Sequence, residues 1–284
     1  MTAVDLALHA RRRPRFRLPA DACDAHCHVF GPGDRFPYAP GRRYTPADAP
    51  KETLAALHEF LGVSRAVIVQ ASCHGDDNRA MLDALAWAPE RMRGVVIAGA
   101  ETSDNELASM HAAGVRGVRF NFVKHLGGAP DMDVFWQVLN RVKPLGWHVV
   151  LHMDAIDIES LSPLIRKLAM PFVIDHMGRI ESEKGLEQPA FKALLGLVRM
   201  ESCWIKVSGA ERISLPPYDA AVPFARALIE ASPERCLWGT DFPHPNPTHE
   251  ADEADLIDLI PKFALDPALQ KKLLVENPVR LYEF

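Results

Sequence analysis

Two histidines one residue apart, His26 and His28, stand in the segment DACDAHCHVFGPG at residues 21–33. Alternate residues of a β-strand point to the same side, so a strand here would place both imidazoles on one face. Neutral imidazoles bind divalent metals and transfer protons near neutral pH, but a pair in a strand can also belong to an ordinary core. The pair alone leaves all three possibilities open, and the elements around it have to decide.

Short apolar segments recur along the whole chain, each followed by a polar or glycine-rich turn and then by a longer amphipathic segment. This pattern is typical of alternating strands and helices. Eight strands are predicted, at residues 23–28, 65–70, 94–98, 115–122, 147–152, 171–176, 203–208 and 236–241. Helices are predicted between them, for example at residues 50–61, 77–88, 103–114, 133–146 and 158–169.

Eight strand–helix units within 284 residues predict an α/β fold, a single (β/α)8 TIM barrel, for which about 250 residues is a typical size. An open doubly wound sheet would normally carry a glycine-rich fingerprint after its first strand, and the chain has none. No linker is long enough to divide domains, so one domain is expected over residues 1–284, with residues 1–20 as an N-terminal arm. The basic segment at residues 11–17 is followed by no apolar region, which predicts a solvated arm rather than a secretory signal.

The composition narrows the class of partner. A net charge of −5 argues against nucleic acid or an anionic membrane as the main partner, because both require a basic surface. The sequence has no apolar run long enough to span a membrane. The five cysteines are an odd number without a C-x-x-C pair, which disfavours a disulfide framework and a structural zinc site. We expect a cytoplasmic monomer or small homo-oligomer that acts on a small molecule.

Polar residues gather where the predicted strands end, and in a (β/α)8 barrel the carboxyl ends of the strands carry the site. They are His26 and His28 on the first strand, Ser72 after the second, Arg119 and His125 at the fourth, His152 on the fifth, His176 on the sixth and Asp241 on the eighth. A single strand histidine is more often a hydrogen-bonded core residue than a ligand. Agreement among five strand ends favours a functional site over that interpretation.

This set of histidines and Asp241 resembles the amidohydrolase superfamily. The segments DAHCHVFGP, VIVQASCHG, RGVRFNF, GWHVV, VIDHMGR, WGTDFPHPN and ENPVRLY resemble, more closely, the 2-pyrone-4,6-dicarboxylate lactonases of that superfamily. The resemblance covers about residues 21–284. It implies a carboxylic ester hydrolase that opens a small carboxylated lactone by water attack on the ester carbonyl, the substrate resembling 2-pyrone-4,6-dicarboxylate, a muconolactone or a sugar lactone.

The resemblance also implies roles for single residues. Asp241 corresponds to the group that deprotonates the attacking water, and His176 most simply polarises the carbonyl. The positions implied to bind the substrate are Tyr44, Ser72, Arg119, His125, Arg179 and Arg212, and His244, on the loop after the eighth strand, is expected to touch it as well. Arginines suit this role because a guanidinium group binds a carboxylate through two parallel hydrogen bonds. A structural salt bridge is the alternative for Arg179 and Arg212.

Two positions depart from the lactonase pattern. His125 stands where that family has an arginine, which weakens the case for a substrate with two carboxylates in the same places. His152 stands where the family, regarded as metal-free, has a tyrosine, and it restores the fifth-strand ligand of metal-dependent relatives such as the sulfomuconolactone hydrolases. We therefore expect one divalent ion, zinc, bound by His26, His28, His152 and Asp241, with a metal-free site as the alternative.

Two other functions remain open on the sequence. A metal-dependent decarboxylase of the same superfamily would share the histidines and Asp241, although QASCHG and RFNF favour the lactonase branch. A non-catalytic small-molecule binding barrel is the third possibility, and the intact Asp241 counts against it. The acidic segment at residues 248–259 is interpreted as the solvated face of a helix.

Overall fold

The computed structural model describes residues 12–245 and 249–284. Eight strands form one sheet in the order β1 to β8, and each is parallel to its neighbour. They are β1 (Cys23–Cys27), β2 (Arg65–Val69), β3 (Met92–Val96), β4 (Val115–Asn121), β5 (His148–His152), β6 (Phe172–Ile174), β7 (Cys203–Lys206) and β8 (Cys236–Leu237). All eight predicted strands are present, and the predicted TIM-barrel fold is confirmed.

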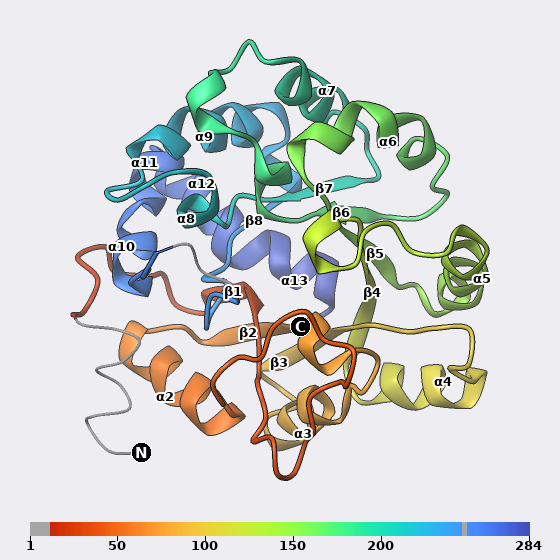
Figure 1. Cartoon of the computed structure of the whole chain (residues 1–284). Helices are drawn as coiled ribbons and strands as arrows, with labels where there is room; N and C mark the ends of the chain where they lie inside the picture. The colour runs from red at the N-terminus through yellow and green to blue at the C-terminus, as the bar shows by residue number, and fades with distance from the viewer. Residues whose placement is uncertain (1–11, 246–248) are drawn as a thin grey trace.

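Helices surround this sheet (Figure 1). They are α2 (Lys51–Leu61), α3 (Arg79–Trp87), α4 (Asp104–Ala112), α5 (Met132–Val142), α6 (Ile158–Ile165), α7 (Pro189–Val198), α8 (Ala210–Ile213), α9 (Val222–Ala231), α10 (Glu253–Asp258), α11 (Ile260–Phe263), α12 (Pro267–Lys271) and α13 (Asn277–Tyr282). Local sequence explains several of their ends. Helix α4 begins at a capping box formed by Ser103 and Glu106, and α2 ends at Gly62, whose left-handed backbone (φ 84°) suits glycine.

The barrel closes between β1 and the segment that follows β8. Three backbone hydrogen bonds make the closure, from Ala25 N to Trp238 O (2.9 Å), from Asp241 N to His26 O (2.8 Å) and from His28 N to Phe242 O (2.8 Å). Strand β8 itself has only two residues. The chain therefore completes the barrel with the same short segment that carries Asp241.

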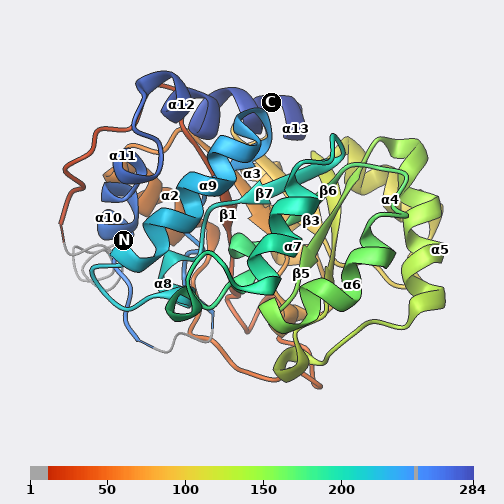
Figure 2. The ribbon, with the colours of Figure 1, turned by 90° about the horizontal axis from the view of Figure 1, so that it is seen from above.

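The inside of the barrel is filled mainly by small and branched apolar side chains, among them Val67, Val95, Val150 and Val173. Tyr282 of α13 packs against this cluster and closes one end of the barrel. Helix α13 and the short helix α8 lie towards opposite ends of the strands (Figure 2). The end near α8 is the end at which the strands finish, and it is left for the polar residues.

Strand β1 contains a β-bulge that changes which side chains face inward. Asp24 pairs with Ala66 but Cys27 pairs with Ile68, so β1 has one residue more than β2 between these positions. Ala25 belongs to the apolar cluster inside the barrel, whereas Cys27 packs in the outer layer under the helices. Bulges of this kind re-aim side chains beside active sites, and here the bulge turns His26 towards the site above the core.

Two expectations about charged segments hold only in part. In the described part of the N-terminal arm, Arg13, Arg15 and Arg17 are exposed, as expected of a solvated arm. The arm is also docked, because Arg12 forms ion pairs with Asp255 and Asp258, and Asp258 accepts the backbone N–H of Phe16 (2.9 Å). The acidic segment is not simply a solvated helix face either, since Glu253 at the start of α10 is completely buried. Its side chain is paired with His244, which belongs to the site described below.

No helix among the described residues is long and apolar enough to cross a membrane. All five cysteines are buried and free of disulfide bonds. Burial raises the pKa of the Cys73 thiol to about 11, so this cysteine, which stands beside His74, is not an activated nucleophile.

Candidate active site

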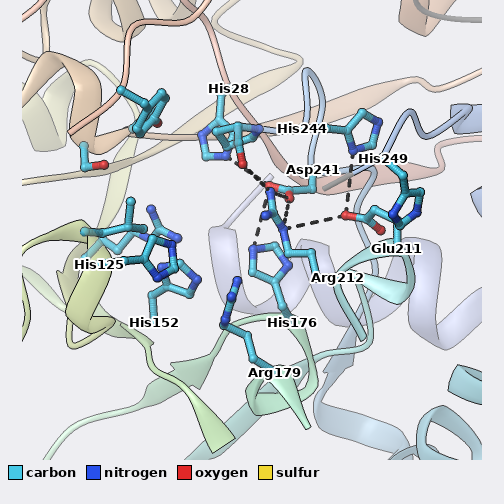
Figure 3. A pocket seen from close by; sticks show the side chains of 16 residues that line it. His28, His125, His152, His176, Arg179, Glu211, Arg212, Asp241, His244 and His249 are labelled. Atoms are coloured by element: carbon cyan, nitrogen blue, oxygen red, sulfur yellow. Dashed lines mark hydrogen bonds and ion pairs between the residues drawn. The ribbon is translucent and has the colours of Figure 1, made fainter. Parts of the chain in front are cut away.

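A cavity of about 150 Å³ opens at the carboxyl ends of the strands. Its walls contain every residue predicted to bind the substrate, namely Tyr44, Ser72, Arg119, His125, Arg179, Arg212 and His244. His28, His152, His176 and Asp241 also line it (Figure 3). His26 is not in the wall, but its Nε2 lies 3.5 Å from Asp241 Oδ1. The structure therefore brings all the sequence-predicted site residues to one end of the barrel.

Asp241 is at the centre of this group (Figure 3). Its Oδ1 faces three imidazoles, with His28 Nε2 at 3.1 Å, His26 Nε2 at 3.5 Å and His176 Nε2 at 3.7 Å. Its Oδ2 is held by the guanidinium group of Arg212. Burial alone would raise the pKa of this carboxyl, but Arg212 and His176 hold the pKa well below its usual range. Asp241 is therefore a carboxylate at neutral pH.

The backbone before Asp241 has to pass very close to β1. A Cβ at Gly239 would lie 2.5 Å from the backbone nitrogen of His26, so only glycine fits there. Thr240 is fixed by Asp24, which accepts its backbone N–H at 3.0 Å and its hydroxyl proton. Asp241 itself has a φ of 62°, a left-handed backbone that is uncommon for a side-chain-bearing residue. These contacts position the carboxylate over the mouth of the barrel.

His28 and His176 each have one ring nitrogen occupied by a protein partner. His28 Nδ1 donates to the carbonyl of Val69 at 2.7 Å, and its Nε2 lies 3.1 Å from Asp241 Oδ1. His176 Nδ1 bonds to the hydroxyl of Ser208 at 3.0 Å. Burial lowers the pKa of His176 well below its ordinary value. The ring is therefore uncharged, and its Nε2 faces Asp241 Oδ1 at 3.7 Å.

Below these residues lies a buried ionic cluster that the sequence analysis missed. Lys206 on β7 is completely buried, and its Nζ lies 2.9 Å from His26 Nδ1 and 3.2 Å from Asp175 Oδ1. Asp175 also contacts Arg119 Nε at 3.1 Å, and Asp175 Oδ1 lies 3.3 Å from His26 Nδ1. Burial, with Lys206 adding to it, lowers the pKa of His26 to about 4. Nδ1 of His26 thus lies between a donor and an acceptor.

His152, from the end of β5, is buried with both ring nitrogens unbonded within the described part of the chain. It packs against His176, with ring centroids 5.6 Å apart, and burial lowers the pKa of His152 well below its ordinary value. His125 and His152 lie next to each other in Figure 3. Two unpaired nitrogens on one buried ring indicate that His152 faces a ligand rather than a structural partner.

Arg179 reaches the cavity from an unusual turn. Residues His176, Met177, Gly178 and Arg179 all have a positive φ, between 50° and 63°. A side-chain-bearing residue in this region costs about 1–2 kcal/mol, and such strain concentrates at functional sites. Arg179 Nε donates to Asp154 at 2.7 Å.

Arg119 and Arg179 therefore follow one design. In each, the contacting carboxylate holds Nε, at 3.1 Å for Arg119 and 2.7 Å for Arg179. Among the described residues, no hydrogen bond is made by the terminal amino groups of either arginine, and both residues line the cavity. We call Arg119, His125, His152 and Arg179 the arginine side of the site. It offers guanidinium edges to an anion.

The opposite wall contains Glu211 and His244, and Glu253 contacts His244 without lining the cavity; we call these three residues the glutamate side. Glu211 and His244 lie on the other side of Asp241 from His152 in Figure 3. His244 Nε2 bonds to Glu253 Oε1 at 3.2 Å, and its Nδ1 lies 3.7 Å from Glu211 Oε1. Burial opposes the charge on His244, but the two glutamates raise its pKa to about 10. This wall holds an imidazolium ion between two carboxylates.

The donor atoms suited to a metal ion do not coincide with the predicted set. His26, His176 and Asp241 each offer one ligand atom within 4.8 Å of the others. His152 is not part of this group, although its nitrogens are unpaired. A second group of three at the site, Glu211, Asp241 and His244, meets the same distance limit.

The fold and this geometry agree with comparisons to known proteins. The family model described as amidohydrolase matches residues 23–284. The chain belongs to the amidohydrolase family. This amidohydrolase is 48% identical, over 95% of its length and 92% of the relative's, to a 2-pyrone-4,6-dicarboxylate hydrolase from Comamonas testosteroni. It is 42% identical, over 96% of its length and 94% of the relative's, to a 4-sulfomuconolactone hydrolase from Rhizobium radiobacter.

A solved structure is also close to this amidohydrolase. It is that of a probable 2-pyrone-4,6-dicarboxylic acid hydrolase from Acinetobacter baumannii with citric acid bound, and it has a TM-score of 0.83 and 30% sequence identity. The match covers 93% of this amidohydrolase and all of that chain (100%). The predicted resemblance to the lactonases is therefore confirmed.

Several residues of the site were not predicted. Lys206 and Asp175 lie inside predicted strands next to apolar residues, and a charged residue in such a strand was the available signal for both. Glu211 stands beside the predicted Arg212 but has the same sign as the expected substrate. Asn246, which the sequence places two residues after His244 on the same loop and which could also touch the substrate, lies outside the described residues.

Proposed function

We propose that this enzyme hydrolyses the ring ester of a small anionic lactone, with Asp241 as the base and His176 as the group that polarises the carbonyl. The observation that carries the proposal is the orientation of Asp241. Arg212 holds Oδ2, while Oδ1 is turned to the histidines. The relatives that are named lactone hydrolases support the same reaction.

Ring opening needs two proton movements, and the residues present can make both. Water attacks the carbonyl carbon and gives one proton to Asp241 Oδ1, while the carbon–oxygen double bond becomes an oxyanion. A neutral His176 that accepts the Ser208 proton at Nδ1 carries its own proton at Nε2, where it can stabilise that oxyanion. The oxyanion then collapses, the bond to the ring oxygen breaks, and that oxygen takes the proton from Asp241. The products are a carboxylic acid, ionised at neutral pH, and a hydroxyl group.

The substrate's acidic group belongs on the arginine side of the site. Arg119 and Arg179 have their Nε atoms on Asp175 and Asp154, which orients the guanidinium planes. Bidentate binding of a carboxylate by such a plane is the strongest hydrogen-bonded pairing that side chains offer. Tyr44, Ser72, Arg212, His125 and His244, which also line the cavity, complete the proposed binding residues. The relative from Acinetobacter baumannii was solved with citric acid bound, and citric acid, like the proposed lactone, carries carboxylate groups.

A divalent metal ion, zinc, is part of the proposal. The residues present fit such an ion, because His26 Nε2 and both nitrogens of His152 are buried without a hydrogen-bond partner among the described residues. His26, His28, His152 and Asp241 are the proposed ligands. His176 lies close enough to His26 and Asp241 to bind an ion with them, but in the mechanism above its Nε2 keeps its proton. When bound, the ion would activate water and withdraw charge from the carbonyl.

The cellular location, the metabolic role and the assembly state of the enzyme are also part of the proposal. Free, buried cysteines fit a reducing compartment, so we keep a cytoplasmic location. A role in the breakdown of aromatic compounds is supported by the name of the pyrone relative. One domain with an N-terminal arm, and a monomer or small homo-oligomer, remain our expectation. Neither nucleic acid nor a membrane is expected as a partner.

The first experiment is an assay of acid release. Purified enzyme is given 2-pyrone-4,6-dicarboxylate, a muconolactone and a sugar-acid lactone in a pH-stat, beside a carboxylated diene that is monitored for carbon dioxide. At least one lactone should be opened, and Asp241→Asn should lower kcat/KM for it by about 1000-fold or more. The matched control is Asp219→Asn, whose side chain is 60% exposed beside Lys262.

Two results would contradict the proposal. A fully active Asp241→Asn enzyme would show that Asp241 is not the base. Carbon dioxide release without lactone opening would favour the decarboxylase. Failure of every substrate would favour a non-catalytic binding protein instead.

A further inference from the structure

Glu211 is a buried carboxylate on the cavity wall to which the mechanism gives no task. It is 6% exposed and lines the cavity directly before Arg212 on α8. Neither of its two carboxylate oxygens has a hydrogen-bond partner among the described residues. Burying an ionised group without hydrogen bonds is unfavourable, so unsatisfied oxygens in a cavity wall indicate a partner that arrives with the ligand.

The neighbouring cations do not satisfy Glu211. Arg212 Nε and His244 Nδ1 each lie 3.7 Å from Glu211 Oε1, which is beyond hydrogen-bond distance. Each cation also has a closer acid, because Arg212 holds Asp241 and His244 bonds to Glu253 at 3.2 Å. Arg212 and His244 are thus each engaged by another acid, which leaves negative charge in excess at Glu211. His249 lies beside Glu211 in Figure 3, but both oxygens of Glu211 remain without a hydrogen bond within the part of the chain that the structure describes.

This excess determines what kind of ligand group fits beside Glu211. A substrate carboxylate would meet a like charge, whereas the arginine side across the cavity offers guanidinium groups. A hydroxyl group fits, since it donates one hydrogen bond and adds no charge.

We infer that Glu211 is a specificity residue that accepts a hydrogen bond from a ring hydroxyl of the lactone. The inference rests on the proposed lactone hydrolysis and narrows its substrate to a hydroxylated lactone with its acidic group on the opposite, arginine side.

A pair of matched lactones tests this role. The five-membered lactone of 2-hydroxyglutaric acid has one carboxylate and no ring hydroxyl, and the lactone of 2,3-dihydroxyglutaric acid adds one hydroxyl, tested as both diastereomers. The wild-type enzyme should favour the hydroxylated lactone by at least about 10-fold in kcat/KM, the range of one hydrogen bond to a charged group. In Glu211→Gln the ratio of the two kcat/KM values, hydroxylated over plain lactone, should fall about 10-fold.

Glu253→Gln is the matched control, because Glu253 contacts His244 but does not line the cavity. It should affect both lactones equally. If Glu211→Gln also lowers both rates by the same factor, Glu211 acts only through His244 and the inference is wrong. Equal use of both lactones by the wild type would overturn the inference and leave lactone hydrolysis standing. Absence of acid release from all lactones tested, with or without a hydroxyl, would instead overturn the proposed function.

Discussion

The two sides of the site solve the burial of charge in opposite ways. On the arginine side, one acid holds each guanidinium group at Nε, as Asp175 holds Arg119 and Asp154 holds Arg179. On the glutamate side, one cation, His244, is shared by two acids. The arginine side therefore presents the terminal amino groups of two guanidinium groups to a ligand, and the glutamate side presents the carboxylate of Glu211. One cavity can therefore orient a substrate by charge at one end and by a hydrogen-bond donor at the other.

The largest effect should come from pH, through the imidazolium of the glutamate side. The pKa of His244 is raised to about 10 in the folded protein, above the ordinary value of 6.5. The folded state then holds a proton that the unfolded state loses, so this stabilisation is complete below pH 6.5 and is lost as pH rises through about 10. It amounts to a few kcal/mol at most.

Urea unfolding at pH 6, 8 and 10 measures this contribution. The difference in free energy of unfolding between the wild type and His244→Gln should be largest at pH 6 and should shrink towards pH 10. A difference that is constant or grows with pH would mean that His244 is not charged in the folded protein. The glutamate side would then lack its cation, and the contrast with the arginine side would change.

The next effect concerns metal affinity on the arginine side. We expect one zinc ion per chain in the wild type by elemental analysis, and an affinity about 100-fold lower in His152→Tyr by equilibrium dialysis, because a ligand is removed. His125→Tyr makes the same substitution at an exposed residue of the same wall and should bind zinc as the wild type does. A fully active wild type without metal would establish the metal-free alternative.

The smallest effect should be on substrate affinity. Arg179→Gln removes a guanidinium group whose side chain is 21% exposed, so solvent weakens its pairing, and we expect KM for the anionic lactone to rise about 10-fold with a smaller change in kcat. Arg166→Gln, on the exposed end of α6, is the matched control. An unchanged KM would place the anion elsewhere and remove the functional distinction between the two sides.

The sequence predicts the barrel well because each strand and helix is signalled locally. Periodicity found all eight strands, and residues at strand ends pointed to Asp241 and the histidines around it. What it could not predict are contacts between distant strands. Lys206 contacts His26, which is 180 positions away in the sequence, and the residues of neither strand indicate that the two side chains meet.

On the glutamate side, the acidic character of residues 248–259 led to a wrong expectation for Glu253. Glu253 stands in a strongly acidic segment, and such segments are usually solvated, yet it is completely buried against His244. The bulge in β1 was equally hidden, because strict alternation was assumed for a strand that has one extra residue. Both errors arise where tertiary contacts override a local pattern.

The closure of the barrel has a consequence for how this enzyme can change. The hydrogen bonds that join β1 to residues 238–242 are made by the peptide that carries Asp241 and by the peptides of His26 and His28. The segment that closes the barrel thus also carries Asp241, so we expect a substitution that loosens these hydrogen bonds to disorient that carboxylate. New substrates can be reached by altering the walls contributed by the loops after β4 and β7. The closing segment has to be inherited intact.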